Sequence, residues 1–224
     1  MLRRVAAFCV MGGVASAVLT GCGDDAKAPG TKPTGSAAGG TAVPPATTPS
    51  EQALGGSRLG GAAAGVTLQL PAGWKEVDPT TDTSEVVRTT FRLTGDLGEL
   101  TKQLMGQQKK QGIVFAIDSS VTSGLAPHLS AGCDRGGTIG ASMEQLKAKT
   151  QAMHKGARIT DLTVGGRPAF KAAYTSAGRD GVTTDEVTVR VPMGDNRFCF
   201  VDLAAEQGSL PAQTEQVLAS FKVS

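Results

Sequence analysis

The chain has 224 residues, of which 40% are hydrophobic and only 4% aromatic. Its 22 basic and 20 acidic side chains give a formal net charge of +2. These totals leave room for one domain with a core, and they indicate neither a basic surface for nucleic acid nor an electrostatic funnel for acidic substrates. We therefore expect no nucleic-acid partner.

The first 21 residues have the layout of a secretory signal peptide. Arg3 and Arg4 precede an uncharged run, residues 5–19, and small residues lead to Cys22. A basic start, a short apolar run and a small-residue break are typical of an export signal, and the run is shorter than the about 20 residues of a membrane span. Because residues 1–21 hold two basic side chains and no acidic one, the mature chain has no formal net charge.

The sequence Leu-Thr-Gly-Cys at residues 19–22 resembles the bacterial lipobox. This resemblance implies cleavage before Cys22, a diacylglyceryl group on that cysteine, and anchoring at the extracytoplasmic face of the cell membrane. Two or more acyl chains hold a protein stably at a bilayer. The alternative is an ordinary cleaved signal followed by an incidental cysteine.

Behind Cys22, residues 22–64 are interpreted as a disordered linker. Of the 25 residues at positions 26–50, 22 are Ala, Pro, Gly, Ser or Thr. Such a segment has too little apolar surface to offset the entropy of ordering. The folded domain is expected over residues 65–224.

The first half of the domain is predicted to mix strands and helices. Residues 66–70 alternate between apolar and polar, residues 86–93 are an extended run, and residues 113–117 are a short buried strand. Capping pairs, Asp96 with Glu99 and Ser142 with Gln145, predict two helices. Their core-facing residues are expected to be Leu97, Leu100, Leu104 and Met105 in the first helix and Met143, Leu146, Thr150 and Met153 in the second.

The second half is predicted to be antiparallel hairpins. Strands at residues 159–164 and 168–174 meet at Gly165-Gly166, and strands at 187–191 and 198–203 meet at residues 194–196. The last strand is apolar on both faces, which predicts a central position in the sheet. A final helix after residue 209 would place Leu210, Val217, Leu218 and Phe221 in the core. The class is α+β: a single domain with a mostly antiparallel sheet flanked by about three helices.

Two cysteines, Cys133 and Cys199, remain in the domain itself. In an exported chain such a pair is most simply a disulfide, with two free thiols as the alternative. Cys133 lies in a glycine-rich segment, residues 132–140, which we interpret as a flexible loop because it lacks the Gly-Lys-Ser/Thr ending of a phosphate-binding loop.

The remaining candidate residues have plain structural explanations. His128 and His154 do not have metal-ligand spacing, so we expect histidines with ordinary partners and no metal. Trp74 and Tyr174 are the only Trp and Tyr; they either line a pocket or, as we favour, pack in the core. No catalytic motif is present, so we expect no catalytic residue and no cofactor.

Short motifs resemble actinobacterial lipoproteins of the LpqN type, which are related to the PsbP-like fold. They are Leu-Pro-Ala-Gly-Trp at residues 70–74, Val-Gly-Gly-Arg-Pro-Ala at 164–169 and Ala-Ser-Phe at 219–221. The resemblance covers residues 66–224. It implies an αβα sandwich and a family whose members act mostly as binding or assembly factors, with no catalytic motif to carry over.

These observations favour a non-catalytic, lipid-anchored module of the cell envelope that binds a protein partner or an envelope lipid or glycan. One alternative is an envelope hydrolase whose site is assembled from distant residues. Another is a small solute-binding lipoprotein, although a single domain of this size lacks the two lobes between which such receptors hold their ligands.

Overall fold

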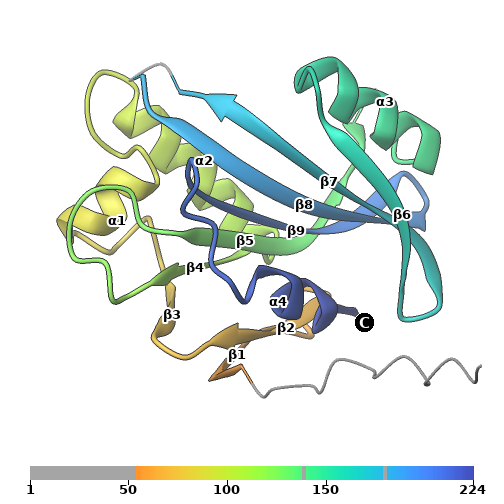
Figure 1. Cartoon of the computed structure of the whole chain (residues 1–224), viewed down its shortest axis with the longest axis horizontal. Helices are drawn as coiled ribbons and strands as arrows, with labels where there is room; N and C mark the ends of the chain where they lie inside the picture. The colour runs from red at the N-terminus through yellow and green to blue at the C-terminus, as the bar shows by residue number, and fades with distance from the viewer. Residues whose placement is uncertain (1–53, 138–139, 179–180) are drawn as a thin grey trace, which may run out of the picture. The chain divides into compact units, whose positions relative to one another are not determined.

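The computed structural model describes residues 54–137, 140–178 and 181–224 (Figure 1). The predicted signal peptide, Cys22 and residues 23–53 of the predicted linker lie outside the described residues. Within the described ranges, no helix is long and apolar enough to cross a membrane.

The centre of the domain is a seven-stranded antiparallel sheet. Its strands, in spatial order, are β3 (Trp74–Val77), β4 (Val114–Asp118), β5 (His128–Arg135), β9 (Arg197–Glu206), β8 (Thr183–Gly194), β7 (Arg167–Ala177) and β6 (Arg158–Val164). A smaller antiparallel sheet has the order β1 (Gly55–Gly61), β2 (Val66–Pro71), β10 (Lys222–Val223). The predicted hairpins are confirmed, and β9 is central as predicted, between β5 and β8.

Four helices are present in the described part of the chain: α1 (Glu85–Thr90), α2 (Gly98–Lys110), α3 (Met143–Met153) and α4 (Thr214–Ala219). Figure 1 shows the small sheet and α4 below the large sheet and α3 above it. The predicted α+β class is therefore confirmed, with one short helix more than expected.

The two faces of the large sheet pack against different layers. Along β8, for example, Val187, Val189 and Val191 point into the largest core cluster, which also contains Leu68 of β2 and Val217 of α4. The opposite face, which we call the helical face, carries two smaller clusters. One joins Phe200 to α1 and α2, and the other joins Phe170 to α3. Alternation of side chains along each strand produces this division.

One hairpin illustrates how local sequence fixes the sheet. Gly165 and Gly166, between β6 and β7, have φ of 56° and 79°. A two-residue turn with two positive φ values matches the twist of the flanking strands, and only glycine, asparagine and aspartate adopt it readily. Asp195 and Asn196, between β8 and β9, have φ of 50° and 56°, so that turn has the same chemistry.

The predicted linker boundary at residue 64 is wrong. Residues 55–61 form strand β1, which pairs with β2 along most of its length. Leu59 is fully buried in the main core. Composition suggested disorder because this strand contains one large apolar residue among glycines. Its order comes from the hydrogen bonds that β2 supplies, which composition does not reveal.

Residues 86–93 were expected to be extended, but Glu85–Thr90 is helix α1. The segment is rich in valine and threonine, which favour strands only weakly. Here Val86 and Val87 sit on consecutive helical positions and are both buried in the cluster with Phe115. Tertiary packing therefore overrides the local preference of these residues.

The helix predicted from Asp96 begins at Gly98, and its N-cap position, Leu97, makes no side-chain capping bond. Its expected core face is largely wrong. Leu97, Leu100 and Leu104 are 51%, 53% and 51% exposed, because the helix packs on the core through the side that carries Met105.

The capping box of the next helix is confirmed: the Gln145 N–H donates to Ser142 Oγ at 3.3 Å, and the Ser142 N–H donates to Gln145 Oε1 at 3.0 Å. Of its expected core residues, Leu146 is buried, whereas Met153 is 65% exposed. The helix therefore contacts the sheet mainly through its first turns.

Candidate functional site

The predicted disulfide is present. Cys133 on β5 and Cys199 on β9 lie directly opposite each other in the sheet register, and their sulfurs are bonded. Residues 132–135, expected to be part of a flexible glycine-rich loop, instead belong to strand β5. Because disulfides persist in oxidising compartments, this bond fits a domain that works outside the cytoplasm.

A hollow of about 440 Å³ opens on the helical face of the large sheet. We call it the sheet cleft. Its floor comes from strands β5, β9, β8 and β7, and one wall comes from α2 and the end of α1. The lining residues that matter most are Phe91, Met105, His128, Tyr174, Glu186 and Asp202.

The sheet register explains why these polar side chains meet. His128 lies opposite Ala204, Ala204 lies opposite Glu186, and Glu186 lies opposite Tyr174, so all four form one row across four strands. Directly opposed side chains in antiparallel strands have Cβ atoms about 4.5–5.5 Å apart. The smallest residue of this row is Ala204, on the central strand β9. Its short side chain leaves space between the larger polar side chains, and this space is the bottom of the cleft.

Glu186 is held in place by two hydroxyl groups. Thr184 Oγ1 donates to Glu186 Oε1 at 3.1 Å, and the Tyr174 hydroxyl also hydrogen-bonds to this carboxylate. Burial, with the negative charges of Glu186 and Asp202, raises the pKa of Tyr174. Tyr174 is therefore protonated at neutral pH and acts as the donor in its bond to Glu186.

Asp202, in the next row, is neutralised within the protein. Arg190 binds it in a bidentate manner, with Nη1 2.6 Å from Oδ1 and Nη2 3.1 Å from Oδ2. Thr188 Oγ1 also donates to Oδ1. The guanidinium carbon lies 5.0 Å from the ring centre of Phe200, a cation–π distance. By contrast, Glu186 forms no ion pair with any residue that the structure describes.

His128 contributes an acceptor to the cleft. Its Nδ1 lies 3.0 Å from the Ala126 carbonyl, which can only accept, so Nδ1 carries the proton and Nε2 has a free lone pair. Burial lowers the pKa of His128, although the Ala126 hydrogen bond and Glu186 act in the opposite direction. The imidazole is therefore neutral at pH 7.

His154 contacts two residues that line the cleft. Its ring stacks on that of Tyr174, with 3.7 Å between ring centres, and its Nδ1 lies 3.4 Å from Ser176 Oγ. Both histidines thus have ordinary partners, as expected from the sequence. The fold nevertheless brings them to the same region, since His128 lines the cleft and His154 contacts a residue that lines it. No group of three metal-binding side chains occurs among the described residues.

Arg92, at the rim of the cleft, has a left-handed backbone with φ of 54°. It directly follows the C-cap residue of α1, where the Leu93 N–H donates to the Arg88 carbonyl at 2.7 Å. Glycine is the usual residue at this position of a helix end. An arginine there costs about 1 kcal/mol, so the surrounding structure must hold the backbone in this conformation.

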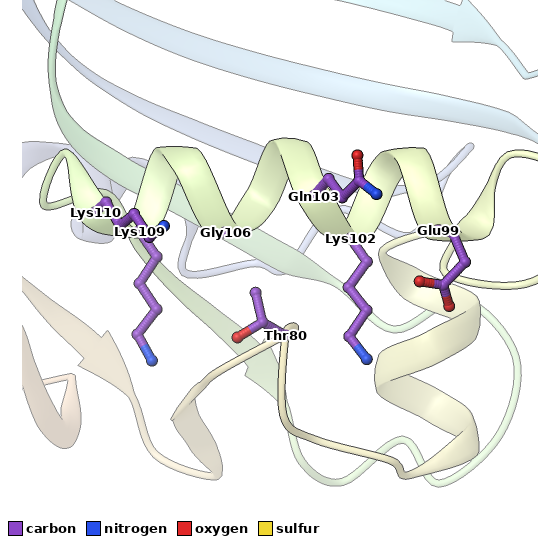
Figure 2. A pocket seen from close by; sticks show the side chains of 7 residues that line it. All are labelled: Thr80, Glu99, Lys102, Gln103, Gly106, Lys109 and Lys110. Carbon is purple, nitrogen blue, oxygen red and sulfur yellow. The ribbon is translucent and has the colours of Figure 1, made fainter.

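A second hollow, of about 560 Å³, runs along the outer side of α2 (Figure 2). Figure 2 shows Lys102 and Lys109 extending on either side of Thr80. Lys109 pairs with Asp78. Burial alone would raise the pKa of Asp78, but hydrogen bonds from Lys109 and Thr80 outweigh it and lower the pKa to about 2. This groove is formed by one helix and one loop, and Lys109, which lines it, is already paired with Asp78.

No protein-family model matches the sequence, and no curated protein matches it either. Solved structures with a similar chain path include a protein of Bacteroides thetaiotaomicron VPI-5482, with a TM-score of 0.44 and 12% identity over 75% of this chain. This chain covers only 48% of the Bacteroides protein. A cyanobacterial PsbP (CyanoP) from Synechocystis sp. PCC 6803 has a TM-score of 0.42 and 14% identity, covering 75% of this chain and 92% of that one. Membership of the LpqN-type lipoproteins stays a prediction.

The structure separates the two aromatic residues singled out in the sequence. Trp74 is buried in the main core as expected, whereas Tyr174 lines the sheet cleft. Sequence reasoning did not identify Glu186 and Asp202. A signal was present, because Glu186, Thr188 and Arg190 alternate with valines along one strand. Charged residues on the second face of a central strand indicate that this face is not wholly covered by apolar residues.

Proposed function

We propose that this chain is a lipid-anchored, non-catalytic binding module of the cell envelope, of the LpqN type, and that its ligand binds in the sheet cleft. Cys22 would carry the lipid anchor. The observation that supports the binding role is the convergence of Tyr174, Glu186 and His128 around the low floor at Ala204. A concave site with a few convergent polar groups is the usual form of a binding site.

The lining of the cleft favours a ligand with polar groups over a buried acyl chain. A carboxylate and a neutral imidazole line the same hollow. An acyl chain bound there would displace water from both groups without replacing its hydrogen bonds, which is energetically costly. The large apolar residues on either side of the sheet are already packed into three core clusters. A protein partner or the polar part of an envelope glycan therefore fits better than a lipid tail.

Binding is tested with the full chain in detergent and three envelope fractions: purified cell wall, vesicles of envelope lipids, and solubilised envelope proteins. Replacing Ala204 by Phe fills the floor of the cleft without entering the core, because Ala204 is only half-buried. We expect at least one fraction to bind and Ala204→Phe to weaken that binding tenfold or more. Thr160→Phe, on an exposed position of edge strand β6, is the matched control. Equal binding by both variants would place the ligand elsewhere.

The anchor is tested separately by intact mass and fractionation. The mature protein should lack residues 1–21 and carry added acyl mass on Cys22, and Cys22→Ala should be found outside the membrane fraction or unprocessed. Processing at another residue, or membrane association that survives the substitution, would refute the anchor while leaving the cleft proposal intact.

An envelope hydrolase remains the second candidate, because the cleft does bring titratable groups together from separate strands. Glu186 and the neutral His128 lie in one row with a single alanine between them. Incubating the full chain with purified cell wall and with envelope lipids, and assaying soluble products, decides the matter. Turnover that Glu186→Gln abolishes would replace the binding proposal.

A further inference from the structure

We propose that the sheet cleft and the neighbouring leucines of α2 form one docking surface for a polypeptide partner. A basic side chain of the partner would enter the cleft against Glu186, and an apolar side chain would lie on the leucines. This inference rests on the proposed binding function and specifies its ligand.

The charges of the cleft point to a cationic group. Each half-buried carboxylate there needs compensation, and Arg190 supplies it for Asp202. Glu186 receives hydrogen bonds from Thr184 and Tyr174 but has no ion pair within residues 54–137, 140–178 and 181–224. Its neighbour in the row across Ala204 is a neutral histidine that offers an acceptor. Arg92 adds a positive charge at the rim of the cleft, so the cationic group is expected next to Glu186, where an ammonium or guanidinium would pair with the carboxylate and could donate to the histidine.

The second part of the surface is the apolar stripe on α2. Leu97, Leu100 and Leu104 follow one another at spacings of three and four residues, which places them on the same side of the helix. All three are about half-exposed. Clustered exposed leucines are uncommon on a free surface and mark places where another molecule binds.

The two parts adjoin each other. Thr101 lines the cleft, and Leu97 and Leu104 lie four residues before and three residues after it on the same helix, so they are its direct neighbours on the helix surface. A peptide that enters the cleft over α2 to reach Glu186 therefore contacts the exposed leucines of that helix. Neutral sugars would leave both the carboxylate charge and the leucines without a partner, and this is why we favour a polypeptide.

The experiment is a selection of random 12-residue peptides displayed on phage against the full chain in detergent micelles. We expect the enriched peptides to share a lysine or arginine at a fixed spacing from a large apolar residue. A synthetic peptide of the enriched sequence should bind Glu186→Gln at least about tenfold more weakly, because the amide keeps the shape and the bond from Thr184 but removes the charge. The double variant Leu100→Ser/Leu104→Ser should lose a similar factor.

Glu215→Gln is the matched control, since Glu215 is an exposed carboxylate on α4, where it pairs with Lys171, and it should bind the peptide normally. Thermal unfolding of each variant shows that the fold is retained. A selection with no enrichment, a consensus without a basic residue, or a peptide that binds Glu186→Gln normally would overturn the inference. If Ala204→Phe still abolishes envelope binding in that case, the proposed function stands and only the choice of ligand is wrong.

Discussion

Breaking the bond between Cys133 and Cys199 should lower the stability of the domain by about 4 kcal/mol. The two residues are 66 positions apart, and closing a loop of that length removes about 15 cal/mol/K of entropy from the unfolded chain, or about 4 kcal/mol at 25 °C. For a domain of this size, each kcal/mol shifts the melting temperature by about 2–4 °C. We therefore expect a fall of roughly 8–16 °C.

The assay is thermal unfolding followed by circular dichroism, with the oxidised protein compared to the same protein in reductant. Reduction keeps both sulfur atoms, so it isolates the cross-link from the packing of the fully buried Cys199. The double variant Cys133→Ala/Cys199→Ala should lose about 1 kcal/mol more, since it also leaves space in the core. A reduced protein that melts within about 3 °C of the oxidised one would refute the reasoning, because the cross-link would then constrain the unfolded chain very little.

Three further predictions concern single positions. Arg92→Gly should be about 1 kcal/mol more stable than Arg92→Ala, since both variants remove the side chain but only glycine adopts a φ of 54° without strain; equal stability of the two variants in urea titration would contradict this. Leu104→Ser on the exposed stripe should change the free energy of unfolding by less than about 0.5 kcal/mol. Leu203→Ala in the core should lower it by about 2–5 kcal/mol. Equal effects of the two substitutions would show that the stripe is packed against the protein. The pKa of Asp78 falls from 3.8 to about 2 on folding, so the ionised carboxylate stabilises the folded state. This stabilisation is fully present above pH 4 and is lost as the pH falls towards 2. Because Lys109 is half-exposed, we expect this stabilisation to be about 1 kcal/mol. Asp78→Asn should remove that part of the acid dependence of stability, as measured by urea titration between pH 2 and 5.

Much of the sheet followed from the sequence because its signals are local. Gly165-Gly166 and Asp195-Asn196 each have a conformation that few other residue pairs adopt, so the hairpins they form were predictable. The disulfide was predictable for a different reason, because two cysteines allow only one pairing within the domain.

The errors arose where long-range packing decides the outcome. Strand β1 is ordered by pairing with β2, and α1 is helical although its valines favour strands. The side of α2 that faces the core is the side of Met105, which packs against the cluster around Phe115, and not the side of the leucines. The cleft depends on the register of four strands, since His128 and Glu186 are neighbours only through Ala204, and no sequence pattern states which residues of separate strands face each other.

The small sheet has a consequence for the order of folding. Strand β2 is flanked by β1, which precedes it, and by β10, which follows all the other described elements along the chain. In addition, the backbone N–H of Gln69 on β2 donates a hydrogen bond to the Ser220 hydroxyl at 2.9 Å. The layer that covers one face of the large sheet is therefore complete only after residues 222–223 are available. Because the pairing of β10 with β2 joins segments far apart in the sequence, we expect this layer to be completed late in folding.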